Sequence, residues 1–450
     1  MTDQNNKTIG MISLGCSKNQ IDAERLLAML QSAGYRISSD PRQCGAVIIN
    51  TCGFIDSAKQ EAIDVILEFA AMKQEGMVGG LIVTGCLPER YREEFAKELP
   101  EVDGALGIGK NAEIVNAVDS VLRGEKYISF GEKEALSLEG DRLLAGASYS
   151  AYLKIAEGCD NRCSYCAIPD IRGRFRSRPM ENIIEEARTL IRNGVVEINL
   201  VAQDTTRYGE DIYGKLMLPD LLTRLCEIPG LRWLRLLYCY PDRVTDELLD
   251  AIREQPKIVK YMDLPIQHAS GKILKQMNRS GDEASLRALI GKIRQKVPGI
   301  TLRTTLITGF PGESEEDFEI LCRFVQEMAF DRLGCFAYSQ EENTPAGERV
   351  DQLDEDLKRR RAEIIMETQA LIAARKALEM IGREIEVICE GYDSERRMCV
   401  SRSQADAPDI DTKVYFSADR TPEAGTFLKV KITGADGYDL LGALPPNPAQ

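Results

Sequence analysis

The sequence predicts an α/β protein of three parts: an amino-terminal domain with an open parallel sheet, a partial (β/α)6 TIM-like barrel, and a small carboxyl-terminal OB-like β-barrel. Two successive alternations of strand-like and helix-like segments predict the first two parts, because such alternation is typical of parallel sheets flanked by helices. Short strand-like runs separated by Gly, Pro and Asp turns predict the third part. The predicted limits are residues 1–125, a linker at 126–148, then 149–375 and 376–443.

The first alternation ends near residue 125. Its predicted strands are Ile9–Leu14, Ala46–Asn50 and Leu81–Thr84, and its predicted helices are Gln20–Ala33, Ser57–Met72, Glu89–Leu99 and Ala112–Leu122. Periodicity is lost from Gly131 to Ser148, which is typical of a linker.

The second alternation starts at Tyr149 and contains six β/α units. Its predicted strands are Ala151–Ala156, Glu197–Val201, Trp233–Tyr238, Lys260–Leu264, Thr301–Ile307 and Arg332–Phe336, and its predicted helices are Pro179–Asn193, Leu218–Glu227, Thr245–Glu254, Glu283–Lys296 and Ser314–Met328. Ser314 and Asp317 have the spacing of a capping box at the start of the last helix. Six units are too few for a closed eight-fold barrel, so we expect an open one with reactive residues at the carboxyl ends of its strands.

A long helix at Asp354–Ile381 precedes the third part, and its run of basic residues is interpreted as a solvated face. The predicted barrel strands are Ile385–Cys389, Met398–Ser401, Lys413–Phe416, Phe427–Ile432 and Asp439–Leu444. From Lys376 to Asp439 there are nine Lys or Arg against thirteen Asp or Glu, a net charge of −4. An acidic module is a poor reader of phosphate and a better docking surface for a basic protein.

Composition and charge limit the classes of function that this chain can have. The formal net charge of −14 argues against nucleic acid held mainly by phosphate contacts and favours a basic partner. No apolar stretch approaches the roughly 20 residues of a membrane span, and Met1–Lys7 lacks the apolar core of a signal peptide. Thirteen cysteines without an export signal indicate metal ligation in the reducing cytoplasm. The single histidine, His268, argues against histidine-based catalysis and is interpreted as structural.

The most informative motif is a cysteine triplet with the spacing C-x3-C-x2-C: Cys159, Cys163 and Cys166. Thiolates so close in sequence favour one soft metal centre, either zinc or an iron–sulfur cluster. Structural zinc takes four ligands and only three are local, whereas a cubane held by three thiolates leaves one iron open for a small molecule. A zinc knuckle completed by a distant cysteine, and three cysteines packed in a core, are the alternatives.

With Tyr165 before its last cysteine, this triplet resembles the signature of the radical S-adenosylmethionine (SAM) enzymes. The resemblance implies a [4Fe-4S] cluster whose open iron chelates the amino and carboxylate groups of SAM. One electron from the cluster would then split the sulfonium and give a 5′-deoxyadenosyl radical, while the protein orients the cofactor and excludes side reactions.

A second triplet follows the three amino-terminal strands: Cys16, Cys52 and Cys86. Ligands bind open parallel sheets in the crevice beyond the carboxyl ends of the strands, so these distant thiolates are expected to meet and to hold a second cluster. Glycines beside all three would let the backbone approach a bulky cluster. Cys44 lies before its strand, at the other end of the sheet, and is left out. The alternative is three unrelated small residues in tight turns.

Followed by a radical SAM core, the second triplet resembles that of the methylthiotransferases, down to Asn50-Thr51-Cys52-Gly53 and Gly85-Cys86. The resemblance implies two [4Fe-4S] clusters and a carboxyl-terminal TRAM domain. The segments Gln203–Gly209 and Gly53–Ala58 resemble the branch that modifies ribosomal protein S-twelve, whereas the tRNA-modifying branch typically carries Gln-Asn-Val after the second barrel strand. A tRNA adenosine methylthiotransferase is therefore the alternative within the family.

The implied reaction is methylthiolation of the β-carbon of an aspartate in ribosomal protein S-twelve, free or in the ribosome. A radical formed at the first cluster would abstract hydrogen, sulfur at the second cluster would couple with the carbon radical, and a second SAM would supply the methyl group. The resemblance also implies an external electron donor of the flavodoxin or ferredoxin type, and a monomer is our expectation. The competing class is a non-catalytic iron–sulfur or zinc protein that binds the ribosome.

Polar residues at the carboxyl ends of the barrel strands are candidates for holding SAM. With the support of the family resemblance, the predicted contacts are Tyr165, Gln203, Gln267 and Gly309, the last because glycine permits close approach of the backbone to the adenosyl group. Loop side chains that bond their own backbone are the alternative. Four arginines after the cluster loop alternate in sequence, and in an extended chain all would lie on one side: Arg172, Arg174, Arg176 and Arg178. They could bind an anion such as the SAM carboxylate, an acidic substrate or RNA phosphate, and a solvated edge is the alternative.

Overall fold

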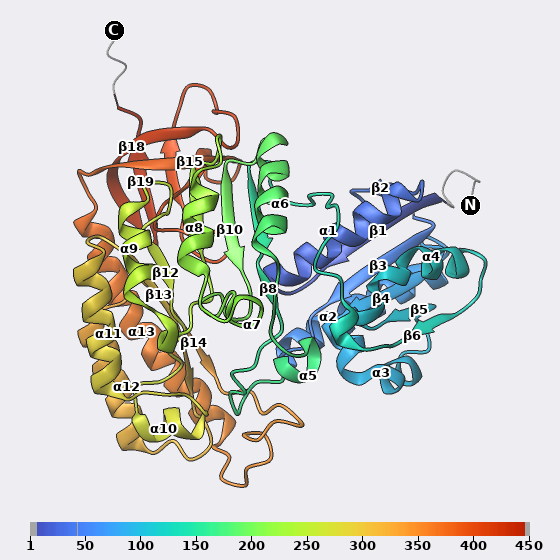
Figure 1. Cartoon of the computed structure of the whole chain (residues 1–450), viewed down its shortest axis with the longest axis horizontal. Helices are drawn as coiled ribbons and strands as arrows, with labels where there is room; N and C mark the ends of the chain where they lie inside the picture. Colours follow the sequence, from blue (N-terminus) through green and yellow to red (C-terminus); the bar gives the residue numbers. More distant parts are fainter. Residues whose placement is uncertain (1–6, 43, 446–450) are drawn as a thin grey trace.

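The structure, a computed structural model, describes residues 7–42 and 44–445 and has the three predicted parts. In Figure 1 the amino-terminal domain lies at the right, the central barrel at the left, and the carboxyl-terminal barrel at the top left. Residues 1–6, which belong to the segment used to predict that no signal peptide is present, lie outside the described residues. Among the described residues, no helix is long and apolar enough to cross a membrane.

The amino-terminal domain is a six-stranded sheet in the order β2-β1-β3-β4-β5-β6, and every neighbouring pair is parallel. Its elements are β1 (Thr8–Ser13), α1 (Ser17–Ser32), β2 (Arg36–Ser38), β3 (Ala46–Thr51), α2 (Asp56–Gln74), β4 (Leu81–Gly85), α3 (Cys86–Glu98), β5 (Gly104–Leu106), the 3-10 helix η2 (Ile108–Glu113), α4 (Ile114–Leu122) and β6 (Tyr127–Ser129). The strands β2, β5 and β6 are not predicted from the sequence, because three residues are too few to show a period. Since β6 is the edge strand, the sheet extends past the predicted limit at residue 125.

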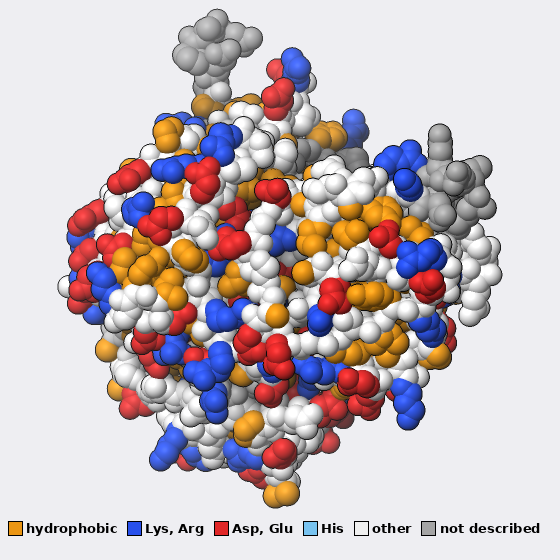
Figure 2. All heavy atoms as spheres, turned by 45° about the vertical axis from the view of Figure 1, so that its right-hand side comes forward, with side chains coloured by type: hydrophobic (Ala, Val, Ile, Leu, Met, Phe, Trp, Pro, Cys, Tyr) orange, Lys and Arg blue, Asp and Glu red, His pale blue; other side chains and the backbone are white. Residues whose placement is uncertain are grey.

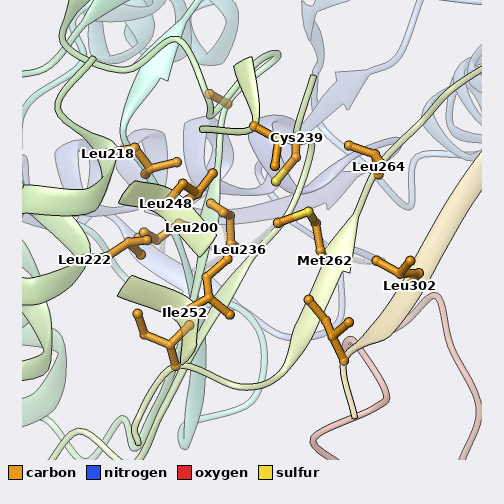
Figure 3. Close-up of a cluster of buried hydrophobic side chains, with 14 of the residues drawn as sticks. Leu200, Leu218, Leu222, Leu236, Cys239, Leu248, Ile252, Met262, Leu264 and Leu302 are labelled. Atoms are coloured by element: carbon orange, nitrogen blue, oxygen red, sulfur yellow. The ribbon is translucent and has the colours of Figure 1, made fainter. Parts of the chain in front are cut away.

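Six parallel strands form the central barrel as two sheets, ordered β11-β10-β7 and β12-β13-β14. They are β7 (Ser150–Lys154), β10 (Glu197–Val201), β11 (Trp233–Leu236), β12 (Tyr261–Asp263), β13 (Thr301–Thr308) and β14 (Arg332–Ala337). A parallel bridge between Leu234 and Ile258 joins the two sheets. Within the described residues β7 and β14 are unpaired with each other, so the barrel is open, as predicted. Its core includes Leu200, Leu236 and Met262, whose side chains gather in one buried cluster (Figure 3).

Helices follow the strands on the outside of the central barrel (Figure 1): α6 (Met180–Arg192), α8 (Leu218–Cys226), α9 (Asp246–Glu254), α11 (Glu283–Lys296) and α12 (Glu315–Met328). The predicted capping box of Ser314 and Asp317 forms at the start of α12. Short elements near the cluster loop and the barrel mouth are not predicted from the sequence: β8 (Ala156–Glu157), α5 (Ile168–Arg172), β9 (Arg176–Ser177), α7 (Glu210–Tyr213), the 3-10 helix η4 (Pro241–Arg243) and α10 (Gly271–Gln276).

The carboxyl-terminal part is a closed barrel in the order β15-β16-β17-β19-β18, reached through the long helix α13 (Glu355–Glu379). Its strands are β15 (Glu384–Asp393), β16 (Met398–Ser403), β17 (Val414–Ser417), β18 (Phe427–Asp436) and β19 (Asp439–Ala443). It docks on the central barrel through a buried ion pair in which Arg402 Nη2 lies 2.6 Å from Glu197 Oε2. Arg235 is the second cation on this carboxylate, with its Nη2 3.2 Å from Glu197 Oε1.

The predicted linker is irregular apart from β6 and the 3-10 helix η3 (Lys133–Ala135), and it is anchored to both domains that it joins. The buried side chain of Arg142 contacts Glu24 of α1 at 2.5 Å and Glu186 of α6 at 2.7 Å. This double ion pair fixes the orientation of the amino-terminal domain against the central barrel.

Candidate functional site: two cysteine triplets at a domain interface

The first triplet lies on the loop between β8 and α5, at the carboxyl end of the first barrel strand. Cys159, Cys163 and Cys166 are all partly exposed, and hydrogen bonds from Cys159 N to Gly173 O and from Cys166 N to Cys163 O fix the loop. Gly158 has a φ of +76°, and a Cβ there would lie 2.1 Å from the carbonyl oxygen of Arg174. The loop therefore needs glycine at this position.

A half-buried arginine, Arg279, faces the first triplet. Arg279 Nη1 lies 3.8 Å from the sulfur of Cys163 and 3.4 Å from the hydroxyl of Tyr165, and its guanidinium stacks 4.3 Å from the ring centre of Tyr240. Without a metal, burial raises the pKa of Cys159 to about 11 and raises that of Cys166 further above its usual value. Metal binding at these thiols therefore releases protons, and the nearby cation favours the thiolate form.

The second triplet assembles at the carboxyl ends of neighbouring strands of the amino-terminal sheet. Cys16 precedes α1, Cys52 follows β3, and Cys86 begins α3 after β4. A Cβ on Gly15 would lie 2.7 Å from the Cβ of Cys52, so the loops pack closely only because this residue is glycine. Burial, followed by the charges of the other two thiols, raises the pKa of Cys52 to about 12. The Cβ position of Gly15, the residue before Cys16, also lies 3.3 Å from Sγ of Cys52, so the loops of these two cysteines are in contact.

Two cations accompany the second triplet. Burial raises the pKa of Cys16, but the positive charges of Lys18 and Arg172 outweigh burial, and the pKa is lowered. Arg172, at the end of α5 in the central barrel, places Nη2 3.3 Å from the sulfur of Cys86. Cys86 also packs against Ala167 and Ile171 of the segment that follows the first triplet.

A buried network of charges connects the two triplets. Arg172 contacts Asp22 of α1 at 2.6 Å and Glu157, beside the first triplet, at 3.3 Å. Lys154 of β7 contacts the same two carboxylates at 2.5 and 2.6 Å. Gln203 donates to Glu157 at 2.6 Å. Because two buried cations balance two buried carboxylates, the network holds both cysteine loops in a fixed relation.

The donor sets fit iron–sulfur clusters better than single ions. Within residues 7–42 and 44–445, no three His, Cys, Asp or Glu side chains are arranged to hold one metal ion. Structural zinc needs four ligands around one point, whereas the thiolates of a cubane bind different iron atoms. Three partly exposed or buried sulfurs per site and a nearby arginine suit a cluster of net negative charge.

The four predicted SAM contacts lie at the carboxyl ends of the barrel strands or on the cluster loop. The side-chain oxygen of Gln203 is buried without a hydrogen-bond partner, which leaves it available to a ligand. Gln267 has a φ of +70°, and its N–H donates to Thr305 O. Tyr165 packs with Phe310 and Tyr338. These roles stay predictions.

The structure gives Gly309 a packing role of its own. The backbone of Gly309 lies close to helix α13, since a Cβ at position 309 would lie 2.4 Å from Cγ of Lys358. Its N–H donates to Glu313 at 2.9 Å, so this group is already satisfied within the protein. Helix packing therefore requires a glycine here, and the contact of Gly309 with the adenosyl group stays a prediction.

The four alternating arginines do not form one row, because α5 precedes Gly173 and the chain is extended only over β9. Arg172 and Arg178 are buried, the latter against Glu139 and Glu186, whereas Arg174 is exposed and paired with Asp160. His268 is buried, and its Nδ1 accepts from Ser270 N, as expected for a structural residue. Three further residues at the site were not predicted, because their positions depend on contacts between distant segments: Lys18, Tyr238 and Arg279.

Each of the three parts of the chain matches a known family model. The family models that match are the radical SAM superfamily over residues 153–325, the uncharacterized protein family UPF0004 over 8–107, and the TRAM domain over 381–444. Membership of the radical SAM superfamily implies one [4Fe-4S] cluster and SAM. The fold is similar to the radical SAM methyltransferase TsrM of Kitasatospora setae, with a TM-score of 0.55, 12% identity, and coverage of 76% of this chain and 77% of that one.

Similarity to curated proteins extends over the whole chain. The ribosomal protein uS12 methylthiotransferase RimO of Geobacter sulfurreducens is 48% identical over 443 residues, covering 97% of this chain and 98% of that protein. RimO of Desulforamulus reducens is 48% identical over 440 residues, covering 97% and 99%. The chain therefore belongs to the uS12 methylthiotransferase (RimO) family of radical SAM enzymes.

Proposed function

We propose that this chain adds a methylthio group to the β-carbon of an aspartate in ribosomal protein uS12, using SAM and two [4Fe-4S] clusters. The six ligands are Cys159, Cys163 and Cys166 for the first cluster, and Cys16, Cys52 and Cys86 for the second. The observation that carries the proposal is the contact of Arg172, at the end of the first cluster loop, with the sulfur of Cys86. Two clusters held so near each other can act on one substrate carbon.

The bound cofactors supply the hydrogen abstraction, the sulfur and the methyl group. The protein's own residues hold and orient them: Arg279 lies beside Cys163, Arg172 lies beside Cys86, and Glu157 links both loops to Gln203. Burial of this network excludes water, which protects reactive species from side reactions.

Charge supports a basic protein as the substrate. The chain has a formal net charge of −14, and its terminal barrel is also acidic. Figure 2 shows Lys and Arg interspersed with Asp and Glu over the visible face, where no continuous basic surface is present. A ribosomal protein rich in Lys and Arg is attracted to such a surface, and RNA phosphate is not. An external flavodoxin or ferredoxin as electron donor belongs to the same proposal.

The test is the mass of uS12 isolated from cells with and without the gene. We expect a methylthio-sized increment on one aspartate that is lost on deletion. Unchanged uS12 together with loss of methylthio-adenosine from tRNA digests would instead support tRNA as the substrate. Intact clusters without formation of 5′-deoxyadenosine from SAM under reducing conditions would favour the non-catalytic class.

A further inference from the structure

Lys18 is a buried cation beside the second triplet. It lies in the first turn of α1, two residues after Cys16, and only 7% of its surface is exposed. Its ammonium lies 3.3 Å from the ring centre of Tyr238, at the carboxyl end of β11 in the central barrel. Lys18 therefore points across the domain interface toward the mouth of the barrel.

The charge of Lys18 has no carboxylate partner. Among residues 7–42 and 44–445, no Asp or Glu oxygen forms an ion pair with its Nζ, whereas Lys154 and Arg172 share Asp22 and Glu157. A cation–π contact stabilises a buried ammonium and leaves its charge in place. A buried charge without a carboxylate partner is costly. Apart from the thiol of Cys16, whose pKa it lowers, Lys18 faces the ring of Tyr238, so its ammonium is available to the carboxylate of a bound molecule.

Tyr238 is held in a strained conformation under the ammonium. Its φ is +58°, its N–H donates to Asp263 Oδ2 at 3.1 Å, and its carbonyl accepts from Thr205. Left-handed backbone at a residue other than glycine is unfavourable and persists where the surroundings impose it, often at binding sites. The surrounding strand ends thus fix the ring that positions Lys18.

We propose that Lys18 binds the carboxylate of the aspartate that is modified. The inference rests on the proposed function and deepens it by assigning recognition of the substrate. In aspartate the β-carbon bears the carboxylate directly, so an ion pair at Lys18 holds the reacting carbon next to the second triplet and facing the barrel. An adenosine base has no such anion, so the same lysine discriminates between the two substrate classes of the family.

Two other negative groups could meet Lys18: the carboxylate of SAM and the second cluster itself. The experiment separates them by measuring three quantities on anaerobically reconstituted protein. These are the affinity for labelled uS12 by fluorescence anisotropy, the affinity for SAM, and the midpoint potential of the second cluster in a background where Cys159, Cys163 and Cys166 are replaced by alanine.

The variants are Lys18→Met, which keeps length and removes charge, and Lys18→Arg, which keeps charge. Lys126→Met makes the same chemical change at an exposed site of the amino-terminal domain. Each is tested with uS12 and with uS12 in which the modified aspartate is replaced by asparagine. Because Lys18 has no ion-pair partner, its replacement by Met should leave the folded protein intact, which thermal unfolding checks.

We expect Lys18→Met to bind native uS12 about 30-fold more weakly, the loss typical of truncating a buried charge pair, and to bind the asparagine form as the parent does. Lys18→Arg should recover most of the affinity, and Lys126→Met should change nothing. Native affinity in Lys18→Met, or equal losses for both forms of uS12, would overturn the inference. The inference would also be overturned if Lys18→Met weakened SAM binding, or shifted the midpoint potential of the second cluster, while its binding of uS12 stayed unchanged. Failure of the parent protein to bind or modify uS12 would instead refute the proposed function.

Discussion

Nη2 of Arg172 lies 3.3 Å from Sγ of Cys86, although the two residues belong to different domains. The same guanidinium contacts Asp22 of α1, while Cys86 packs on the helix that carries Arg172. The amino-terminal domain and the central barrel are therefore joined at the cysteine sites themselves. A change at this contact is expected to affect the stability of the interface and the environment of both sites.

Replacing Arg172 by methionine should destabilise the protein. Asp22 and Glu157 would then share only Lys154, and removing one partner of a buried ion-pair network costs about 3 kcal/mol or more. Denaturant unfolding of the apoprotein measures this loss. Arg174→Met is the matched control, because Arg174 is exposed and its pair with Asp160 contributes little. Equal stability of the two variants would contradict the structural role of Arg172.

Iron analysis tests whether the triplets act as separate sites. Replacing Cys159, Cys163 and Cys166 by alanine, or Cys16, Cys52 and Cys86, should each remove about half of the iron and sulfide, as expected for two comparable thiolate-held clusters. Replacing Cys44, which is buried at the other end of the sheet, should leave the iron content unchanged. Loss of all iron, or of none, in either triplet variant would count against two independent clusters.

The two alternations and the terminal barrel were predictable because their strands and helices are long enough to show a period. The bounds of α11, for example, are those predicted. Three-residue strands such as β2 carry no such signal. The triplets were predictable because the spacing of the cysteines and the ends of the strands can be identified from the sequence. Lys18 was not, since its burial arises from Tyr238, about 220 residues away in the chain. Gly309 illustrates a glycine whose cause, helix α13, only the structure identifies.

Acid should weaken the docking of the terminal barrel. Burial opposes ionisation of Glu197, but Arg402 and Arg235 lower its pKa from 4.5 to about 2. A carboxyl whose pKa is depressed on folding contributes stability above its unfolded pKa, here about 3 kcal/mol, and loses it as the pH falls from about 4.5 toward 2. The stability difference between the apoprotein and Glu197→Gln should therefore shrink on acidification from pH 6 to pH 3. A constant difference over this range would show that Glu197 does not titrate in this way.

The segment from residue 339 to 351 should loosen when Glu341 loses its charge. This buried carboxylate forms ion pairs with two residues of the amino-terminal domain, Arg90 at 2.9 Å and Lys59 at 3.2 Å. In the same segment, Ala346 N donates to Ser164 O, which lies beside the first triplet. Glu341→Gln should lower the stability by about 2 kcal/mol or more and speed amide exchange in this segment. Glu342→Gln should have a smaller effect, because that side chain is half exposed. Unchanged amide exchange in Glu341→Gln would contradict a role for Glu341 in holding this segment against the amino-terminal domain.

The most direct test of two cooperating sites is the mass of uS12 after incubation with reconstituted protein, SAM and a reductant. We expect the parent protein to add one methylthio group to an aspartate. The variant in which Cys16, Cys52 and Cys86 are replaced by alanine should still form 5′-deoxyadenosine but leave uS12 without sulfur. A methylthio group added by that variant, or none added by the parent, would contradict the assignment of sulfur delivery to the second triplet.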